Sequence, residues 1–152
     1  MQLSLVIPCY NEAANVAALY ERCRDTFVPA GVEYELIYVN DGSRDDTWAA
    51  LLAVQETADC RVQLIDFSRN FGKEAAIMAG LAAAKGDCVV VLDCDLQHPP
   101  EKIVEMYRLW QQGYEVVEGQ KSSRGKESAA HAWAARSFYS IISAAVGFDM
   151  SK

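Results

Sequence analysis

An uninterrupted apolar run at residues 89–92, Val-Val-Val-Leu, ends at two carboxylates, Asp93 and Asp95. Apolar residues in succession are typical of a strand buried on both faces of a parallel sheet. Such sheets bind ligands just beyond the carboxyl ends of their strands. Because alternate residues of an extended segment point the same way, both carboxylates can converge on one hard cation. The run therefore predicts a central strand with a ligand site at its end.

Taken alone, the Asp-x-Asp pattern is equally consistent with two solvated turn acids ahead of a helix that Pro99 and Pro100 open. The decision between the two interpretations depends on what the rest of the chain places at the same edge of the sheet.

The rest of the chain alternates strand and helix patterns. Further strands are expected at residues 3–7, ended by Pro8, and at residues 34–39, 62–67 and 114–118. Asn11 is the expected N-cap of the first helix, and Ser43 with Asp46 forms a capping-box pattern for the second. The alternation predicts an α/β fold with a mostly parallel, Rossmann-like sheet and helices on both faces.

Each polar motif follows a predicted strand. The motifs occupy residues 9–12, 40–43, 68–74 and 93–98, and a polar, partly basic stretch at residues 120–128 follows the last strand. Turns before the strands would be equally polar if these residues served only solvation. The pattern therefore favours one binding site at the carboxyl edge of the sheet.

Composition limits the classes of function. A chain of 152 residues with 51% hydrophobic content fits one globular domain, and a net charge of −7 argues against a general surface for nucleic acid or anionic membranes. The five cysteines show neither CxxC nor zinc-ligand spacing, so we expect free thiols in a reducing cytosol. No apolar run reaches membrane-spanning length.

The C-terminal stretch predicts a truncated domain. A helical pattern through Phe138, Ile141 and Val146 is followed only by residues 147–152, with no element to cover its apolar face. We therefore expect residues 1–152 to be one domain that lacks its C-terminal end, with homo-oligomer formation as an option for the exposed face.

Five motifs together resemble the family-two inverting glycosyltransferases, nearest to the polyprenol-phosphate branch that includes dolichol-phosphate mannose synthase. They occur in the family's order along essentially the whole chain: Pro8-Cys9-Tyr10-Asn11-Glu12, Asn40-Asp41-Gly42-Ser43, Arg69-Asn70-Phe71-Gly72-Lys73, Asp93-Cys94-Asp95-Leu96-Gln97-His98-Pro99-Pro100 and Arg124-Gly125-Lys126-Glu127-Ser128. The resemblance implies the GT-A fold, a nucleoside-diphosphate sugar donor and a polyprenyl phosphate acceptor. It also implies a location at the cytoplasmic face of the inner membrane for the full-length protein, and a soluble fragment.

The resemblance assigns a role to each matched position. The base and ribose pocket would be lined by Pro8, Tyr10, Glu12, Val39 and Asp41. Mg²⁺ or Mn²⁺ would be held against the diphosphate by Asp93, Asp95 and Gln97. The phosphates would be approached by the backbone of Cys94 and by Lys121, Arg124 and Lys126.

Some of these residues also have structural interpretations. Tyr10 and Glu12 could instead serve as a hydrophobic staple and a helix cap. Arg69 and Lys73 are candidates for contact with the nucleotide, but Lys73 could equally be a solvated charge in the first turn of a helix. The resemblance does not make His98 a base, and His131 on an Ala-rich helix suits the surface or packing.

The family's general base is a carboxylate that follows the basic loop. Asp149 lies a few residues too early in the matched segment, so the resemblance implies that the base and any membrane helices lie beyond Lys152. This chain is then expected to bind donor without turning it over.

Two other classes share part of the pattern. A phospho-receiver also places carboxylates at strand ends and binds Mg²⁺, but it requires paired acids in the first loop, where this chain has Pro8 and Tyr10. A nucleotidyltransferase would require a Gly-rich phosphate loop after the first strand, and residues 9–12 contain no glycine.

Overall fold

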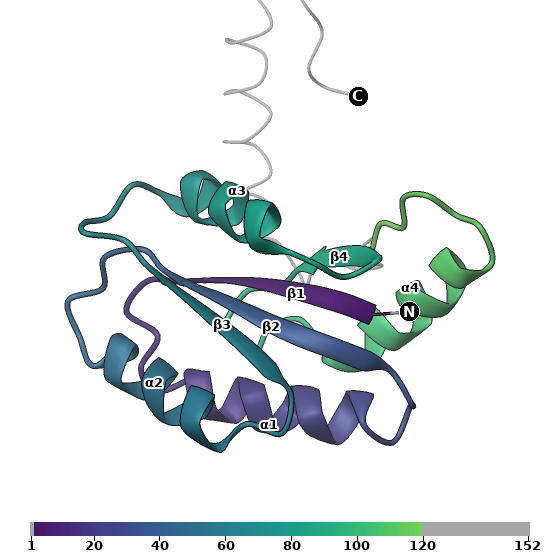
Figure 1. Ribbon diagram of the computed structural model, residues 1–152, viewed down its shortest axis with the longest axis horizontal. Helices are drawn as coiled ribbons and strands as arrows, with labels where there is room; N and C mark the ends of the chain where they lie inside the picture. The colour runs from purple at the N-terminus through teal and green to yellow at the C-terminus, as the bar shows by residue number, and fades with distance from the viewer. Residues whose placement is uncertain (1, 120–152) are drawn as a thin grey trace, which may run out of the picture. The chain divides into compact units, whose positions relative to one another are not determined.

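Four parallel strands form the sheet at the centre of the described residues. The computed structural model describes residues 2–119, and their contacts form one compact unit up to Val117. The elements follow one another as β1 (Gln2–Cys9), α1 (Val16–Phe27), β2 (Glu33–Asn40), α2 (Thr47–Thr57), β3 (Arg61–Asp66), α3 (Lys73–Ala83), β4 (Cys88–Val91) and α4 (Pro100–Gln111). The strand order is β3-β2-β1-β4 (Figure 1). The predicted α/β alternation and parallel sheet are confirmed.

Helices cover both faces of this sheet, as predicted. α1 and α2 lie together on one face and α3 lies on the other (Figure 1). Inward-facing residues of α1, among them Val16, Leu19 and Cys23, are fully buried. α3 approaches β1 so closely that a Cβ on Gly80 would lie 2.3 Å from Cγ1 of Val6. A glycine is therefore required where this helix crosses the sheet.

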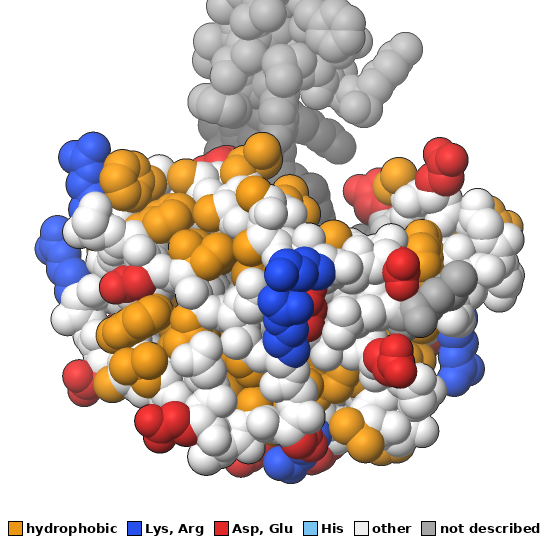
Figure 2. All heavy atoms as spheres, in the orientation of Figure 1, with side chains coloured by type: hydrophobic (Ala, Val, Ile, Leu, Met, Phe, Trp, Pro, Cys, Tyr) orange, Lys and Arg blue, Asp and Glu red, His pale blue; other side chains and the backbone are white. Residues whose placement is uncertain are grey.

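The outward side of α3 is also apolar. Figure 2 shows hydrophobic side chains gathered on the surface over this helix, and Met78 there is 66% exposed. The inward side packs on the sheet through Ala76 and Gly80, which are both buried. Because both sides are apolar, hydrophobic periodicity alone could not identify the face that meets the sheet.

β4 differs from its predicted place in the sheet. It was expected to be central and buried on both faces, but within residues 2–119 it pairs only with β1. Val89 and Val91 are 39% and 43% exposed, because α3 packs on β1 and β2 rather than on β4. An apolar run in a sequence shows that its residues are hydrophobic, but it does not show which elements of the fold cover them.

Two other predictions about the strands were wrong. Residues 114–118 form no strand. β1 does not end at Pro8 but continues to Cys9, with Pro8 paired to Val39. The nitrogen of Pro8 lies on the same side of β1 as the carbonyl of Val6, which bonds to Leu92 beyond the end of β4. Since β4 has ended there, the missing N–H of proline breaks no ladder bond.

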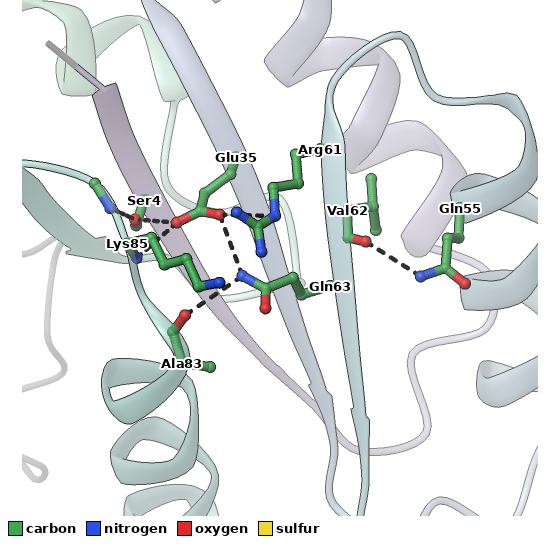
Figure 3. Close-up of polar contacts among 9 residues, drawn as sticks. Ser4, Glu35, Gln55, Arg61, Val62, Gln63, Ala83 and Lys85 are labelled. Atoms are coloured by element: carbon green, nitrogen blue, oxygen red, sulfur yellow. Dashed lines mark hydrogen bonds and ion pairs between the residues drawn. The ribbon is translucent and has the colours of Figure 1, made fainter.

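A buried carboxylate connects three strands to the start of β4 (Figure 3). Glu35 in β2 is fully buried, and its oxygens accept hydrogen bonds from Ser4 Oγ at 2.6 Å, Lys85 N at 2.8 Å and Gln63 Nε2 at 3.1 Å. Arg61 Nε lies 3.6 Å from Oε2 of the same carboxylate. The network thus holds the turn between α3 and β4 against the sheet, and it positions the strand that leads to Asp93.

The same contacts determine the pKa of the Glu35 carboxyl. Burial is the largest single influence and raises this pKa, but the hydrogen bonds from Ser4, Lys85 and Gln63 together with the charge of Arg61 outweigh it, so the pKa lies below its ordinary value of 4.5. The folded protein therefore keeps this carboxylate charged.

We predict that Glu35→Gln lowers the free energy of unfolding at neutral pH by about 1 to 3 kcal/mol, because an amide donor then faces other donors. Because the folded pKa of Glu35 is lowered, the extra stability of the wild type over Glu35→Gln is complete above pH 4.5, the ordinary pKa. It is lost as the pH falls through the folded pKa. Urea unfolding at a series of pH values measures both free energies. A difference that stayed constant down to acidic pH would contradict this role.

Candidate functional site

A cavity of about 340 Å³ opens at the carboxyl ends of the strands. It lies where β2 and β4 flank β1 on opposite sides, which is the point at which the strand order reverses. Open α/β sheets bind ligands at such switch points. The lining residues are Pro8, Cys9, Tyr10, Glu12, Asp41, Asn70, Gly72, Lys73, Asp93, Cys94 and Asp95.

The structure brings together most of the predicted site residues that it describes. Residues predicted from the first loop, the second loop and the Asp-x-Asp motif all line this cavity. Val39 does not, because its side chain is fully buried in β2, and exposed Gln97 also lies outside the lining. Lys121, Arg124, Lys126, His131 and Asp149 fall outside the described residues.

Asp93 and Asp95 place two of the four carboxylates in the described lining of the cavity, the others being those of Glu12 and Asp41. Asp93 Oδ1 lies 2.6 Å from Lys73 Nζ, and Asp95 Oδ1 accepts a hydrogen bond from the backbone amide of Gln97 at 3.0 Å. Between Asp95 and Gln97, Leu96 has a φ of +61°, an uncommon conformation for a residue with a branched side chain. The loop therefore turns sharply after Asp95.

Among residues 2–119, no group of three acidic, histidine or cysteine side chains has the geometry to hold a metal ion. Two carboxylates in one cavity fit an ion that takes its remaining ligands from substrate phosphates and water, as Mg²⁺ does. The ammonium already bound to Asp93 shows that this carboxylate attracts a cation.

Asp41 holds the loop between β3 and α3. Its side chain is at the end of β2, and its two oxygens accept hydrogen bonds from Phe71 N at 2.7 Å and Gly72 N at 3.0 Å. The loop passes so close that a Cβ on Gly42 would lie 2.2 Å from the carbonyl carbon of Arg69. Sequence reasoning predicted only a ligand contact for Asp41, although the glycines at positions 42 and 72 were a signal of close backbone packing.

The first two loops are also bound to each other. Asn11 N donates to Ser43 Oγ at 2.9 Å, and Arg44 N donates to Asn11 Oδ1 at 2.8 Å. Asn11 has a φ of +57°, which asparagine tolerates, and α1 begins only at Val16. The predicted N-cap role of Asn11 was therefore wrong, because its side chain is used between loops.

The predicted capping box of α2 was also wrong. Asp46 is the N-cap residue but its side chain makes no capping hydrogen bond, and Ser43 Oγ is taken by Asn11. Instead, Thr47 N donates to Asp45 Oδ1 at 3.1 Å, and Thr47 Oγ1 accepts from Glu12 N at 2.8 Å. Glu12 precedes α1 rather than lying in its first turn, and its Oε2 accepts from Asn15 Nδ2 at 2.6 Å.

Two thiols lie at the base of the cavity. Cys9 and Cys94 are 1% and 2% exposed and belong to the hydrophobic core. Contact with Cys94 and burial raise the pKa of the Cys9 thiol far above its ordinary value. A thiol held protonated is a poor nucleophile, so Cys9 serves packing. Cys94 belongs to the same buried core.

Lys73 and Arg69, the two basic residues predicted to contact the nucleotide, lie in different places. Lys73, at the start of α3, reaches the cavity, whereas the guanidinium of Arg69 lies over the ring of Phe71 at 4.8 Å and is outside the lining. His98 is exposed and also outside it.

None of the helices within residues 2–119 combines the length and the apolar character that crossing a membrane requires.

Comparison with known proteins identifies the relatives of this chain. The model of glycosyl transferase family 2 matches residues 4–148. An uncharacterized glycosyltransferase of Bacillus subtilis (strain 168) is 41% identical over 99% of this chain and 46% of its own length. The undecaprenyl-phosphate 4-deoxy-4-formamido-L-arabinose transferase of Pseudomonas syringae pv. syringae is 37% identical over 98% of this chain and 44% of its own length. The chain thus spans less than half the length of these relatives.

Solved structures agree on the fold. A mannosyltransferase from Pyrobaculum calidifontis, solved with GDP-Man and Mn²⁺, aligns with a TM-score of 0.62 at 25% identity over 70% of this chain and 31% of that chain. TarS of S. aureus, solved with UDP, aligns with a TM-score of 0.61 at 19% identity over 84% and 40%. The fold is that of the GT-A enzymes.

We predict that Asp41→Ala speeds hydrogen exchange at the Phe71 and Gly72 amides by about 10-fold or more, because both lose a charged acceptor. Exchange measured residue by residue by NMR tests this. Asp25→Ala is the control, since it removes the same charge from an exposed site on α1. Unchanged protection of both amides in Asp41→Ala would show that the loop is held by other contacts.

Proposed function

The chain belongs to glycosyl transferase family 2, and from this premise we propose that its cavity binds a nucleoside-diphosphate sugar as the donor half of a polyprenyl-phosphate glycosyltransferase. The observation that supports the proposal most is the convergence of Asp93 and Asp95 with Tyr10, Glu12 and Asp41 on one cavity at the switch point of the sheet. Aromatic and carboxylate groups from the first two loops suit the nucleoside of such a donor, and the Asp-x-Asp pair suits its diphosphate.

The nucleoside would lie against the first two loops. Tyr10 is 41% exposed and offers an aromatic face to a base. Glu12 and Asp41 offer carboxylate oxygens to ring or ribose donors. Asp41 already accepts two backbone amides, and a carboxylate has further lone pairs to offer.

The diphosphate would lie near Asp93 and Asp95, which would hold Mg²⁺ or Mn²⁺. Such an ion would stabilise the negative charge of the leaving nucleoside diphosphate as the bond to the sugar breaks. The mannosyltransferase from Pyrobaculum calidifontis, whose structure contains both Mn²⁺ and GDP-Man, supports this assignment. The part of this chain in the cavity binds and orients the donor.

We extend the proposal to the acceptor and to the general base. The Pseudomonas relatives are named for undecaprenyl phosphate, which supports a polyprenyl phosphate acceptor and a membrane location for the whole protein. Lys121 and Arg124 would approach a phosphate group, and the general base would lie beyond Lys152.

The strand order counts against the alternative of a phospho-receiver. Receivers have the order 2-1-3-4-5, in which the third strand lies on the far side of the first strand from the second. Here β3 pairs with β2, and β4 takes the place beside β1.

We predict that UDP, GDP or CDP binds this chain far more tightly with Mn²⁺ than with EDTA, and that Asp95→Asn lowers the Mn²⁺-dependent affinity by roughly 10-fold or more. Calorimetric titration of the three nucleotides measures the affinities. Asp25→Asn, at an exposed α1 site, is the control for the lost charge. Equal binding in Mn²⁺ and in EDTA would contradict the metal assignment.

We also predict that the 152-residue chain binds donor without transferring sugar at an enzyme's rate. Losing a positioned general base typically costs about 10²- to 10⁴-fold in rate. Incubation with sugar nucleotides, Mn²⁺ and a short polyprenyl phosphate, followed by assay of released nucleoside diphosphate, tests this. Rapid transfer would place the base inside the chain, with Asp149 as the first residue to replace.

A further inference from the structure

Lys73 is in an unusual position for a cation. It is the first residue of α3, where the helix dipole favours negative charge and disfavours an ammonium. Its side chain is 55% exposed, yet its Nζ lies 2.6 Å from Asp93 Oδ1. The attraction of Asp93 therefore outweighs both the helix dipole and the freedom of a solvated lysine.

The backbone beneath Lys73 is held as well. Gly72, the N-cap residue of α3, has a φ of +101° and donates its amide to Asp41 Oδ2. Lys73 thus begins from a fixed point at the rim of the cavity, and only its flexible stem needs to move.

The charge balance of the cavity makes this contact important. Among the described lining residues, Lys73 is the only cation, whereas the acids are Glu12, Asp41, Asp93 and Asp95. An anionic diphosphate entering this cavity meets mostly negative charge. It therefore depends on the few positive charges that it can meet there.

A divalent cation and Lys73 compete for the same carboxylate. A metal ion on Asp93 repels the Lys73 ammonium and takes over much of the negative charge that holds it, so metal binding favours release of the ammonium. The displaced ammonium then lies at the positive end of α3 without its partner. A diphosphate would restore a partner, because its oxygens can accept both the ammonium and the amides at the start of the helix.

We propose that Lys73 is an internal counterion of Asp93, which weakens metal binding to the empty cavity and then transfers to the diphosphate of the donor, so that metal and donor bind cooperatively. The inference rests on the proposed donor site and adds the residue that couples its two ligands. Such coupling is reciprocal: the metal strengthens diphosphate binding by the same factor as the diphosphate strengthens metal binding.

Lys73→Met tests the proposal because it removes the ammonium and keeps most of the aliphatic stem. We expect the nucleotide-free variant to bind Mn²⁺ about 2- to 5-fold more tightly than the wild type, as suits a partly exposed ion pair. UDP or GDP should bind the variant more weakly in saturating Mn²⁺. Free Mn²⁺ is measured by its EPR signal and nucleotide binding by calorimetry, so neither readout needs turnover.

Two controls accompany this variant. Lys73→Arg keeps a cation beside Asp93 and should retain weak Mn²⁺ binding. Lys102→Met removes an ion-paired ammonium from α4, where Lys102 Nζ lies 2.8 Å from Glu105 Oε1, outside the cavity. Its Mn²⁺ affinity should equal that of the wild type. Thermal unfolding confirms that each variant is folded.

The outcomes separate this proposal from the one on which it rests. If the wild type binds Mn²⁺ with UDP or GDP, but Lys73→Met binds Mn²⁺ alone no more tightly than the wild type, the counterion role is overturned and the donor site stands. An equal gain in Lys102→Met would also overturn it, since net charge would then be the cause. If no variant binds Mn²⁺ or nucleotide at all, the donor site itself fails and the counterion role fails with it.

Discussion

The parallel pairing of β1 with β2 on one side and β4 on the other is the constraint on which the site depends. The pairing brings the carboxyl ends of three strands to one edge, where loops that are far apart in the sequence share a cavity. No single loop contains a complete site. The first loop offers an aromatic ring and a carboxylate, the loop after β2 the carboxylate of Asp41, and the loop after β4 the Asp-x-Asp pair. Asp41 also holds the loop that carries the cation Lys73. The switch in strand order makes them neighbours.

Two buried carboxylates, Glu35 and Asp41, hold this arrangement. The Glu35 carboxylate accepts hydrogen bonds from the protein just before β4, and the Asp41 carboxylate accepts them just before α3. Each therefore positions a segment that carries a charged group of the cavity. Asp93 is 30% exposed, and its bond to Lys73 can be exchanged for another cation. Glu35 thus only fixes the shape of the chain, Asp41 fixes a loop and also lines the cavity, and Asp93 is the lining carboxylate whose partner can change.

The sequence predicted the alternation of elements, the parallel sheet and most of the described cavity lining, because strand-end motifs necessarily meet at one edge. It failed where a side chain is used between loops. Asn11 and Ser43 look like helix caps locally, but they bond to each other's loops. The position of β4 at the end of the sheet formed by residues 2–119 was missed because an apolar run does not reveal its neighbours. The role of Asp41 in holding the Phe71 amide depends on tertiary contact that no local pattern contains.

The most direct test of the account is an anomalous-scattering map from crystals of this chain grown with Mn²⁺ and the nucleoside diphosphate that binds most tightly. We predict one Mn²⁺ peak in contact with the carboxylates of Asp93 and Asp95, with the base against Tyr10 and the Lys73 ammonium moved from Asp93 to a phosphate oxygen. A nucleotide bound elsewhere, or a Mn²⁺ peak away from both carboxylates, would contradict the central claim that the strand ends form the donor site.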